Sequence, residues 1–394
     1  MSSLFGPADS GNVVLDGLRG IGRAASGGYR RFAWTREDHD LREWFDGEAS
    51  ARGLDLVTDR AGNRWAWWGD PDTHGPGVVT GSHLDSVPDG GAYDGPLGVV
   101  SAFAAIDTLR ATGFRPAQPL GVACFGDEEG ARFGVACAGS RLLTGALTAD
   151  RAAALVDADG ITMGEAVART GHAPLGPDPD ALRRVGVFVE LHVEQGRGLV
   201  DLDRPVAVGT AIHPHGRWRV DLTGRADHAG TTLLADRDDP MLALARVVLA
   251  AREAAERHDA LATCGKVRVE PNGVNAIPSR VTAWLDARGA DAARVRAVVA
   301  DVAALAPVVE ESWTDRTPFD AALAARLSTL LDDAPLLPTG AGHDAGVLAA
   351  AGVPTAMLHV RNPTGVSHSP AEHAPDEDCA AGVDALAAVL RELA

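Results

Sequence analysis

The sequence has few cysteines, and their spacing forms no recognisable pattern. Cys124, Cys137, Cys264 and Cys379 are the only four in 394 residues, and no two of them make a C-x-x-C pair. A disulfide framework needs a closely spaced set of cysteines, and a cysteine-type structural zinc site needs paired thiolates. We therefore expect neither, and any metal ion would be bound by other side chains.

Positive charge is also scarce. The chain has 36 lysines and arginines against 54 aspartates and glutamates, which gives a formal net charge of −18. A surface of this sign repels phosphate groups, so we expect neither nucleic acid nor an anionic membrane surface as a partner. A small anionic substrate is still compatible with this charge, because a metal ion or an arginine can reverse the field locally.

Long hydrophobic runs are missing as well. No stretch of about 20 apolar residues is present to cross a bilayer. The first residues, MSSLFGPADSGNVVLDGLRG, lack the basic segment and apolar run of a signal peptide. We therefore expect a soluble, cytoplasmic protein. The hydrophobic content of 46% is sufficient for packed cores, and the length suggests two domains.

What the sequence does contain is an alternation of short apolar strands with helices, which is typical of an α/β sheet. A helical stretch is expected over 11–53, with a break at residues 22–28 (GRAASGG) and with Thr35 capping its main helix. A mostly helical stretch is expected over 142–168, with an Asp-Gly break at 159–160. The predicted strands are 54–58, 63–68, 78–82, 121–126, 185–190 and 355–359; the other predicted helices are 97–109, 321–331, 343–351 and 377–393.

The pattern changes near residue 211. The succession of strand 217–223, helix 240–258, strands 266–270 and 280–286, helix 291–305 and strand 308–313 is the β-α-β-β-α-β order of a ferredoxin-like unit. We therefore predict an α/β catalytic domain with a mixed sheet, formed by residues 1–210 and 317–394. Residues 211–316 would form an inserted ferredoxin-like α+β domain.

The stretch GSHLDSVPDGGAYDGPLG, residues 81–98, follows the apolar run Val78-Val79-Thr80. A strand there would present His83 and Asp85 at its carboxyl end, and residues two apart point the same way. Asp85 could then orient the imidazole of His83, and Asp94 would open the next helix. Taken alone, this stretch could also be a solvated turn rich in aspartate and glycine.

Further candidate ligands fall at or just beyond other strand ends. Imidazole and carboxylate groups together suit Zn, Mn, Co or Ni. The set exceeds the need of one ion and fits two ions that share the aspartate, each with a position left for water. Such pairs, about 3.5–4 Å apart, are usual in hydrolytic sites. The five candidate ligands are His83, Asp94, Glu129, His192 and His368.

Glu128 and Glu129 are adjacent, so both cannot face one ion from a regular strand. One of them would bind metal and the other would face the substrate, where a carboxylate can act as a general base. By itself the pair could equally be a solvated acidic turn, but it follows a buried strand and is flanked by glycine.

Taken together, the motifs resemble the hydantoinase/carbamoylase-type amidases over almost the whole chain. These are two-metal amidohydrolases related to zinc aminoacylases and carboxypeptidases, and they include N-carbamoyl-L-amino acid hydrolases and allantoate amidohydrolases. The resemblance implies a two-metal aminopeptidase-like fold and a small ureido acid as substrate. It also implies a homodimer in which the inserted domain serves as lid and dimerisation domain. The matching motifs are GSHLDSVPDGGAYDGPLG, DEEGARFG, ELHVEQG, DHAGTT, PNGVNAIPSRV, GAGHDA and GVSHSPAEH.

The resemblance assigns roles to individual positions. His83 and His192 would be terminal ligands of one ion, Glu129 and His368 of the other, and Asp94 would bridge the two. Glu128 would be the general base. The remaining assignments are a substrate contact for Gln195, an oxyanion donor reaching the partner subunit's site for His228, and a clamp on the substrate carboxylate for Asn275 and Arg280.

Some features leave other readings open. His215 and the pair Leu233-Leu234 depart from the residues usual in the family, so the substrate is not fixed. An aminoacylase or dipeptidase could share the same metal ligands. A nucleotide-binding oxidoreductase is disfavoured because the G-x-G-x-x-A pattern at 340–345 follows no first strand. A serine hydrolase is disfavoured because G-x-S-x-G is absent, and a non-catalytic binding protein because every candidate catalytic residue is present.

Overall fold

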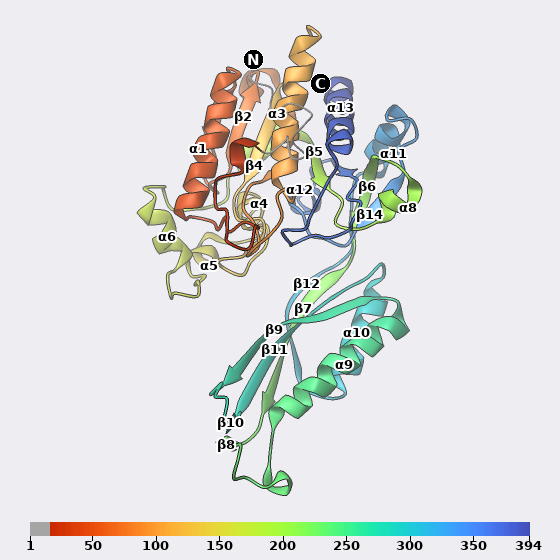
Figure 1. Ribbon diagram of the computed structural model, residues 1–394. Coiled ribbons are helices and arrows are strands. Elements are labelled where there is room, and N and C mark those ends of the chain that lie inside the picture. Colours follow the sequence, from red (N-terminus) through yellow and green to blue (C-terminus); the bar gives the residue numbers. More distant parts are fainter. Residues whose placement is uncertain (1–15) are drawn as a thin grey trace. The chain divides into compact units, whose positions relative to one another are not determined.

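The computed structural model describes residues 16–394. The expectations for the first residues, no signal peptide and the start of a helix, lie outside this range. The chain divides into two compact units, one comprising the described residues up to Ala211 together with Pro318–Ala394, the other Ile212–Thr317 (Figure 1). Within 16–394, no helix has both the length and the apolar character needed to cross a membrane.

The larger unit is built on one mixed sheet. Its strands are β1 (Asp55–Thr58), β2 (Arg64–Trp68), β3 (Gly77–His83), β4 (Leu120–Phe125), β5 (Val185–Val193), β6 (Val206–Ile212), β13 (Thr317–Pro318), β14 (Leu336–Thr339) and β15 (Thr355–Val360). Among the described residues the order is β1-β2-β4-β3-β5-β15-β6-β13, with β14 paired to β6. The central strands β4, β3, β5 and β15 are parallel neighbours, whereas β2 and β6 join them antiparallel. The predicted mixed α/β class is confirmed.

Helices cover both faces of this sheet. Val78 belongs to the core shared with α3 and α13, which lie side by side (Figure 1), while its neighbour Val79 is buried on the opposite face. Helices α4 and α12 pack together and do not contribute to that first core. The helices of this unit are η1 (Asp16–Leu18), α1 (Arg36–Ala51), α2 (Pro71–His74), α3 (Pro96–Ala111), α4 (Ala138–Thr144), α5 (Ala149–Ala153), α6 (Met163–Arg169), α7 (Pro179–Arg183), α8 (Gly198–Leu202), α11 (Ala321–Leu330), α12 (Asp344–Ala350) and α13 (Asp376–Leu393).

The smaller unit contains an antiparallel four-stranded sheet in the order β12-β7-β11-β9. Alternate residues of β7, such as Trp218, Val220 and Leu222, form a core with α9 and α10. A short two-stranded ladder, β10 with β8, lies outside this sheet. The elements are β7 (His215–Thr223), β8 (Asp227–His228), η2 (Leu234–Asp236), α9 (Pro240–His258), β9 (Leu261–Glu270), β10 (Ala276–Ile277), β11 (Arg280–Arg288), α10 (Ala292–Ala303) and β12 (Val308–Thr314).

Two helical predictions were wrong in part. The predicted cap is present, since Thr35 accepts the N–H of Asp38 at the start of α1. The predicted break at residues 22–28 is present, but the other residues between 19 and 35 also form turns instead of a helix, and the buried guanidinium of Arg31 bonds the carbonyls of Leu18 and Ile21. The stretch 142–168 has the predicted break at Asp159-Gly160, but it is also interrupted after Thr144 and Ala153 and is therefore divided among short helices. Glycines and tertiary contacts outweigh helix propensity in both places.

Candidate metal centre

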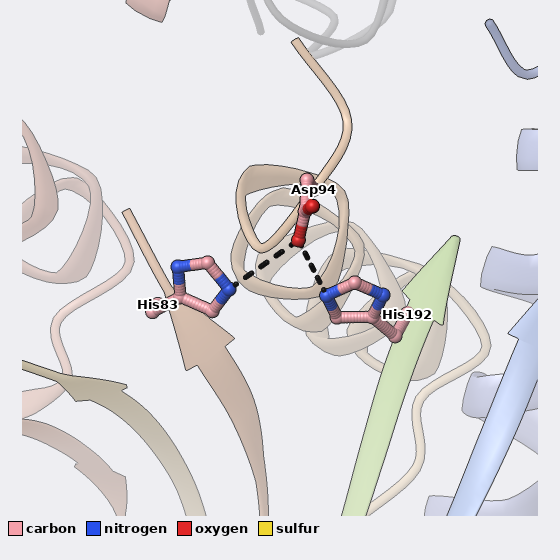
Figure 2. Close-up of side chains that lie close together, drawn as sticks. All are labelled: His83, Asp94 and His192. Atoms are coloured by element: carbon pink, nitrogen blue, oxygen red, sulfur yellow. Dashed lines mark ion pairs between the residues drawn. The ribbon is translucent and has the colours of Figure 1, made fainter. Parts of the chain in front are cut away.

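Parallel strands bring two histidines together at one edge of the larger sheet. His83 is the last residue of β3 and His192 the penultimate residue of β5, and each is 1% exposed. Asp94, just before α3, lies between them (Figure 2). Its Oδ1 is 3.7 Å from His83 Nε2 and 3.1 Å from His192 Nε2. Carboxyl ends of parallel strands meet at one edge, and ligand sites form there in such sheets.

The other carboxylate oxygen of Asp94 belongs to a second group. Asp94 Oδ2 is 3.3 Å from His368 Nε2, and His368 Nε2 is 3.7 Å from Glu129 Oε2. Glu129 follows β4, and His368 lies in the loop between β15 and α13. The structure thus brings together all five predicted ligands, with Asp94 common to both groups.

The spacing and chemistry of these donor atoms fit metal ions. In each group the three donor atoms lie within 4.8 Å of one another. Two nitrogen or oxygen ligands of a tetrahedral zinc ion, each about 2.1 Å from it, are about 3.4 Å apart. The donors are imidazole nitrogens and carboxylate oxygens, which zinc, manganese and cobalt all accept.

Hydrogen bonds set the histidine tautomers for metal binding. The Nδ1 of His83 lies 3.1 Å from the carbonyl oxygen of Asp85, and the Nδ1 of His192 lies 2.8 Å from that of Val193. A carbonyl only accepts, so each Nδ1 carries a proton and donates it. When these rings are neutral, the lone pair of each Nε2 therefore lies on the side of Asp94, which is the arrangement that a metal-ligating histidine requires.

The turn after β4 directs its two glutamates to different groups. Glu128 is 6% exposed, its Oε2 lies 3.8 Å from His83 Nε2, and its Oε1 accepts from Cys137 Sγ at 3.2 Å. Glu129 faces His368 instead. Asp127 before them has φ +54°, a strained left-handed conformation for a residue other than glycine. The turn thus directs the two carboxylates to different groups of candidate ligands.

Asp85 does more than the strand pattern predicted. Strand β3 ends at His83, so Asp85 lies beyond it, and its Oδ1 is 3.5 Å from His83 Nδ1. Its two carboxylate oxygens accept the N–H groups of Glu128 and Glu129 at 3.1 and 3.0 Å. Asp85 therefore fixes the turn that carries both glutamates as well as contacting the histidine.

Buried negative charge is concentrated at this site. Burial, with the nearby Asp344 and Glu129 carboxylates, raises the pKa of Glu128 well above its usual value against the attraction of His83. Burial and the charge of Asp94 raise the pKa of Glu129 to about 7. Burial opposes ionisation of Asp94 too, but His192, His368 and His83 hold its pKa well below the usual value. Carboxylates crowded in a buried site favour a bound cation.

Gln195, predicted to contact substrate, lies beside the second group. Its Nε2 donates to Asp94 Oδ2 at 2.9 Å and to Ser367 Oγ at 3.0 Å. Its Oε1 is buried and has no hydrogen-bond partner within the described part of the chain. Gln195 therefore keeps an unpaired acceptor beside the second group.

The remaining predicted residues belong to the smaller unit. His228 on β8 pairs with Ala276, and the N–H of Ala229 donates to the carbonyl of Asn275 at 2.9 Å. The N–H of Gly230 donates to His228 Nδ1, so the neutral ring carries its proton on Nε2. Arg280 opens β11 and its Nη2 donates to Asp221 at 2.8 Å. These side chains are at least partly exposed, and none belongs to either ligand group.

Several residues near the ligands were not predicted from the sequence. Glu372 is buried and accepts the N–H groups of Tyr93 and Asp94, and Cys137 bonds Glu128. Glu372 lies within the quoted motif GVSHSPAEH, and Cys137 lies three residues after DEEGARFG, but neither was assigned a role. The ring centroid of His343 lies 4.5 Å from that of His192, and His343 makes no side-chain cap bond to α12.

Comparisons with known proteins agree with this geometry. The model of peptidase family M20/M25/M40 matches residues 79–392. An N-carbamoyl-L-amino acid amidohydrolase of Geobacillus stearothermophilus is 36% identical over 395 residues, which cover 95% of each chain. An allantoate amidohydrolase of Escherichia coli (strain K12) is 33% identical over 402 residues, 97% of each chain. The crystal structure of a hydantoinase/carbamoylase family amidase from Burkholderia vietnamiensis superposes with a TM-score of 0.88 at 31% identity, covering 96% of this chain and 95% of that one.

Proposed function

The chain belongs to the metal-dependent peptidase family M20/M25/M40, as an amidohydrolase acting on non-peptide C–N bonds, and from this premise we propose its reaction and the residues that perform it. The resemblance to hydantoinase/carbamoylase-type amidases is confirmed. The substrate we propose is allantoate or an N-carbamoyl-L-amino acid. Hydrolysis of its carbamoyl group would give carbamate, which decomposes to ammonia and carbon dioxide.

The observation that carries this proposal is the sharing of Asp94 between two groups of donors. We propose that His83, His192 and Asp94 hold one divalent ion, and that Glu129, His368 and Asp94 hold the other. Zinc or manganese fits these ligands, with cobalt and nickel also compatible. When bound, a pair of such ions polarises the scissile carbonyl and lowers the pKa of the attacking water.

Protein side chains would perform the proton transfers and hold the substrate. Glu128 takes the proton of the attacking water and returns it to the leaving nitrogen, as a buried carboxylate with raised pKa can. The proton on His228 Nε2 suits donation to an oxyanion. Arg280 with Asn275 would bind the substrate carboxylate, because a guanidinium pairs with two carboxylate oxygens. Gln195 would contact substrate through its unpaired Oε1.

Ammonia release by metal-loaded protein tests the function. Allantoate and a panel of N-carbamoyl-L-amino acids are compared with N-acetyl amino acids at equal concentration. We expect ammonia from at least one ureido acid, at a kcat/KM at least tenfold above that for cleavage of any N-acetyl compound. Cleavage of only the N-acetyl compounds or of dipeptides would contradict the proposal and favour an aminoacylase or dipeptidase. The cytoplasmic location stays a prediction.

We further propose a homodimer formed through the smaller unit. Helix α9 exposes Leu242 and Leu249, 62% and 64% accessible, which lie two turns apart on one face. Strand β9 is an edge of its sheet and exposes Val267. Apolar side chains and an open strand edge on one unit are features that a second copy can cover.

Leu249→Arg is therefore expected to convert the dimer to a monomer, because it places a charge in the apolar contact. Light scattering coupled to size-exclusion chromatography measures the mass. Leu336→Arg, at another exposed leucine (47% accessible) on β14 of the larger unit, is the matched control and should stay dimeric. A monomeric parent protein, or a dimer that survives Leu249→Arg, would refute this interface.

A further inference from the structure

Glu372 is a buried carboxylate that belongs to neither ligand group. It lies between β15 and α13, four residues after His368, and is 5% exposed. Its Oε2 accepts the N–H of Tyr93 at 2.9 Å and that of Asp94 at 3.0 Å. Its Oε1 accepts from Ser367 Oγ at 3.3 Å. A residue distant in sequence thus holds the main chain of the shared ligand.

Main-chain groups pack closely against the Glu372 carboxylate. Among residues 16–394, no arginine or lysine forms an ion pair with Glu372, so main-chain N–H groups and a hydroxyl are its partners. Burying a carboxylate on such terms is costly unless those bonds are strong. A side chain at Gly91 would overlap the Glu372 carboxylate, so only glycine allows the loop before Asp94 to approach it this closely.

The same contacts reach the side chain of Asp94. Ser367 Oγ, bonded to Glu372, also lies 3.2 Å from Asp94 Oδ2. That oxygen is the one that faces His368. Glu372 and Ser367 together therefore fix both the main chain of Asp94 and the carboxylate oxygen of the second ligand group.

The two ligand groups differ in how they are supported. His83 and His192 are on central strands, and their side chains are 1% exposed. The side chain of His368 is 51% exposed, and its φ of +54° lies in the left-handed region. The N–H of Glu372 donates to the carbonyl of Ser369 at 3.0 Å, closing a turn directly after His368. The sheet thus fixes the first group, whereas the second depends on the loop that Glu372 holds.

We propose that Glu372 is a positioning residue for the ion bound by Asp94, Glu129 and His368, and that it sets the affinity of this ion selectively. This inference rests on the proposed two-metal function. It assigns to the residue no contact with the ion or with substrate. Glu372 acts through the main chain of Asp94 and through the turn that carries His368.

Metal binding to the apo-protein tests the proposal by isothermal titration, with metal content measured after equilibration at fixed free zinc. In Glu372→Ala we expect the ion held by Asp94, Glu129 and His368 (the second ion) to bind about 10–100-fold more weakly. This is the range typical for residues that hydrogen-bond metal ligands. The first ion should keep its affinity, so that metal content falls from two towards one. Excess free zinc should restore kcat, which a general structural defect would not allow.

Conservative and surface variants sharpen the test. Glu372→Gln keeps an oxygen that can accept both N–H groups, so it should retain two ions with affinities near those of the parent. Glu377→Ala removes a nearby exposed glutamate at the start of α13 and should change nothing. If Glu372→Gln bound the second ion as weakly as Glu372→Ala does, the proposed role of Glu372 as an acceptor of main-chain N–H groups would be wrong.

Other outcomes distinguish a failure of this inference from a failure of the proposed two-metal function. Two ions bound to Glu372→Ala with parental affinities would overturn it and leave the two-metal function intact. If Glu372→Ala does not fold, Gly91→Ala displaces the same carboxylate and should weaken the same ion; parental binding there would also overturn the inference. A parent protein that binds fewer than two ions would contradict the two-metal function itself and, with it, this inference.

Discussion

Glu128→Gln is expected to lower kcat by about 10²–10⁴-fold while both ions remain bound, because a general acid–base contributes that much to turnover. The turn after β4 directs Glu129 towards His368 and Glu128 towards His83, which places Glu128 for this role. Glu128 is buried, and burial raises the pKa of its carboxyl group, so the ionised carboxylate readily accepts a proton. Glutamine keeps the shape of the side chain but cannot take a proton.

The measurement pairs steady-state kinetics with metal analysis. Glu377→Gln, at an exposed position of α13, is the matched control and should keep parental kcat and metal content. A near-normal rate in Glu128→Gln would show that another group moves the proton. Loss of an ion together with the rate would mean that Glu128 is a ligand instead.

Asp94→Ala is expected to abolish tight binding of both ions, and with them all measurable turnover. Asp94 offers Oδ1 to the group with His83 and His192, and Oδ2 to the group with His368. No other candidate ligand among the described residues is common to both groups. Its removal also leaves three histidines facing one another without the carboxylate between them.

Single-histidine variants provide the comparison. His83→Ala should weaken only the first ion and His368→Ala only the second, whereas Asp94→Ala should weaken both. Metal content after dialysis against a fixed free concentration distinguishes these cases, and circular dichroism checks that each variant is folded. If Asp94→Ala retained two ions, the shared-ligand arrangement would be wrong.

Much of the candidate site could be predicted because its residues follow strands that are easily recognised. The apolar run before His83 and the one before Glu128 are short, buried and bounded by glycine. Parallel pairing then places their carboxyl ends together, so residues far apart in sequence meet without any need to predict side-chain contacts. Local pattern and sheet geometry were sufficient to predict that these strand ends meet, whereas the division of the ligands between two ions came from the family resemblance.

The unpredicted features depend on contacts that no local pattern encodes. Glu372 meets the N–H of Tyr93 across 279 residues of sequence. Asp85 contacts His83 as expected, but β3 ends before it, and the sequence did not predict that its carboxylate also accepts two main-chain N–H groups. Residues 29–34, after the predicted break, were expected to be helical, yet they form turns that the buried Arg31 helps to hold.

The place where the smaller unit is inserted has a consequence for how this protein can change. The chain leaves the larger unit at the end of β6 and returns at β13, and these two strands are hydrogen-bonded neighbours. The N–H of Phe319 donates to the carbonyl of Thr210 at 3.0 Å. To the larger sheet, the whole of Ile212–Thr317 is therefore equivalent to the tip of a hairpin. An insertion at such a junction can be replaced by another domain, in evolution or by design, without changing the order of the strands that carry the candidate ligands.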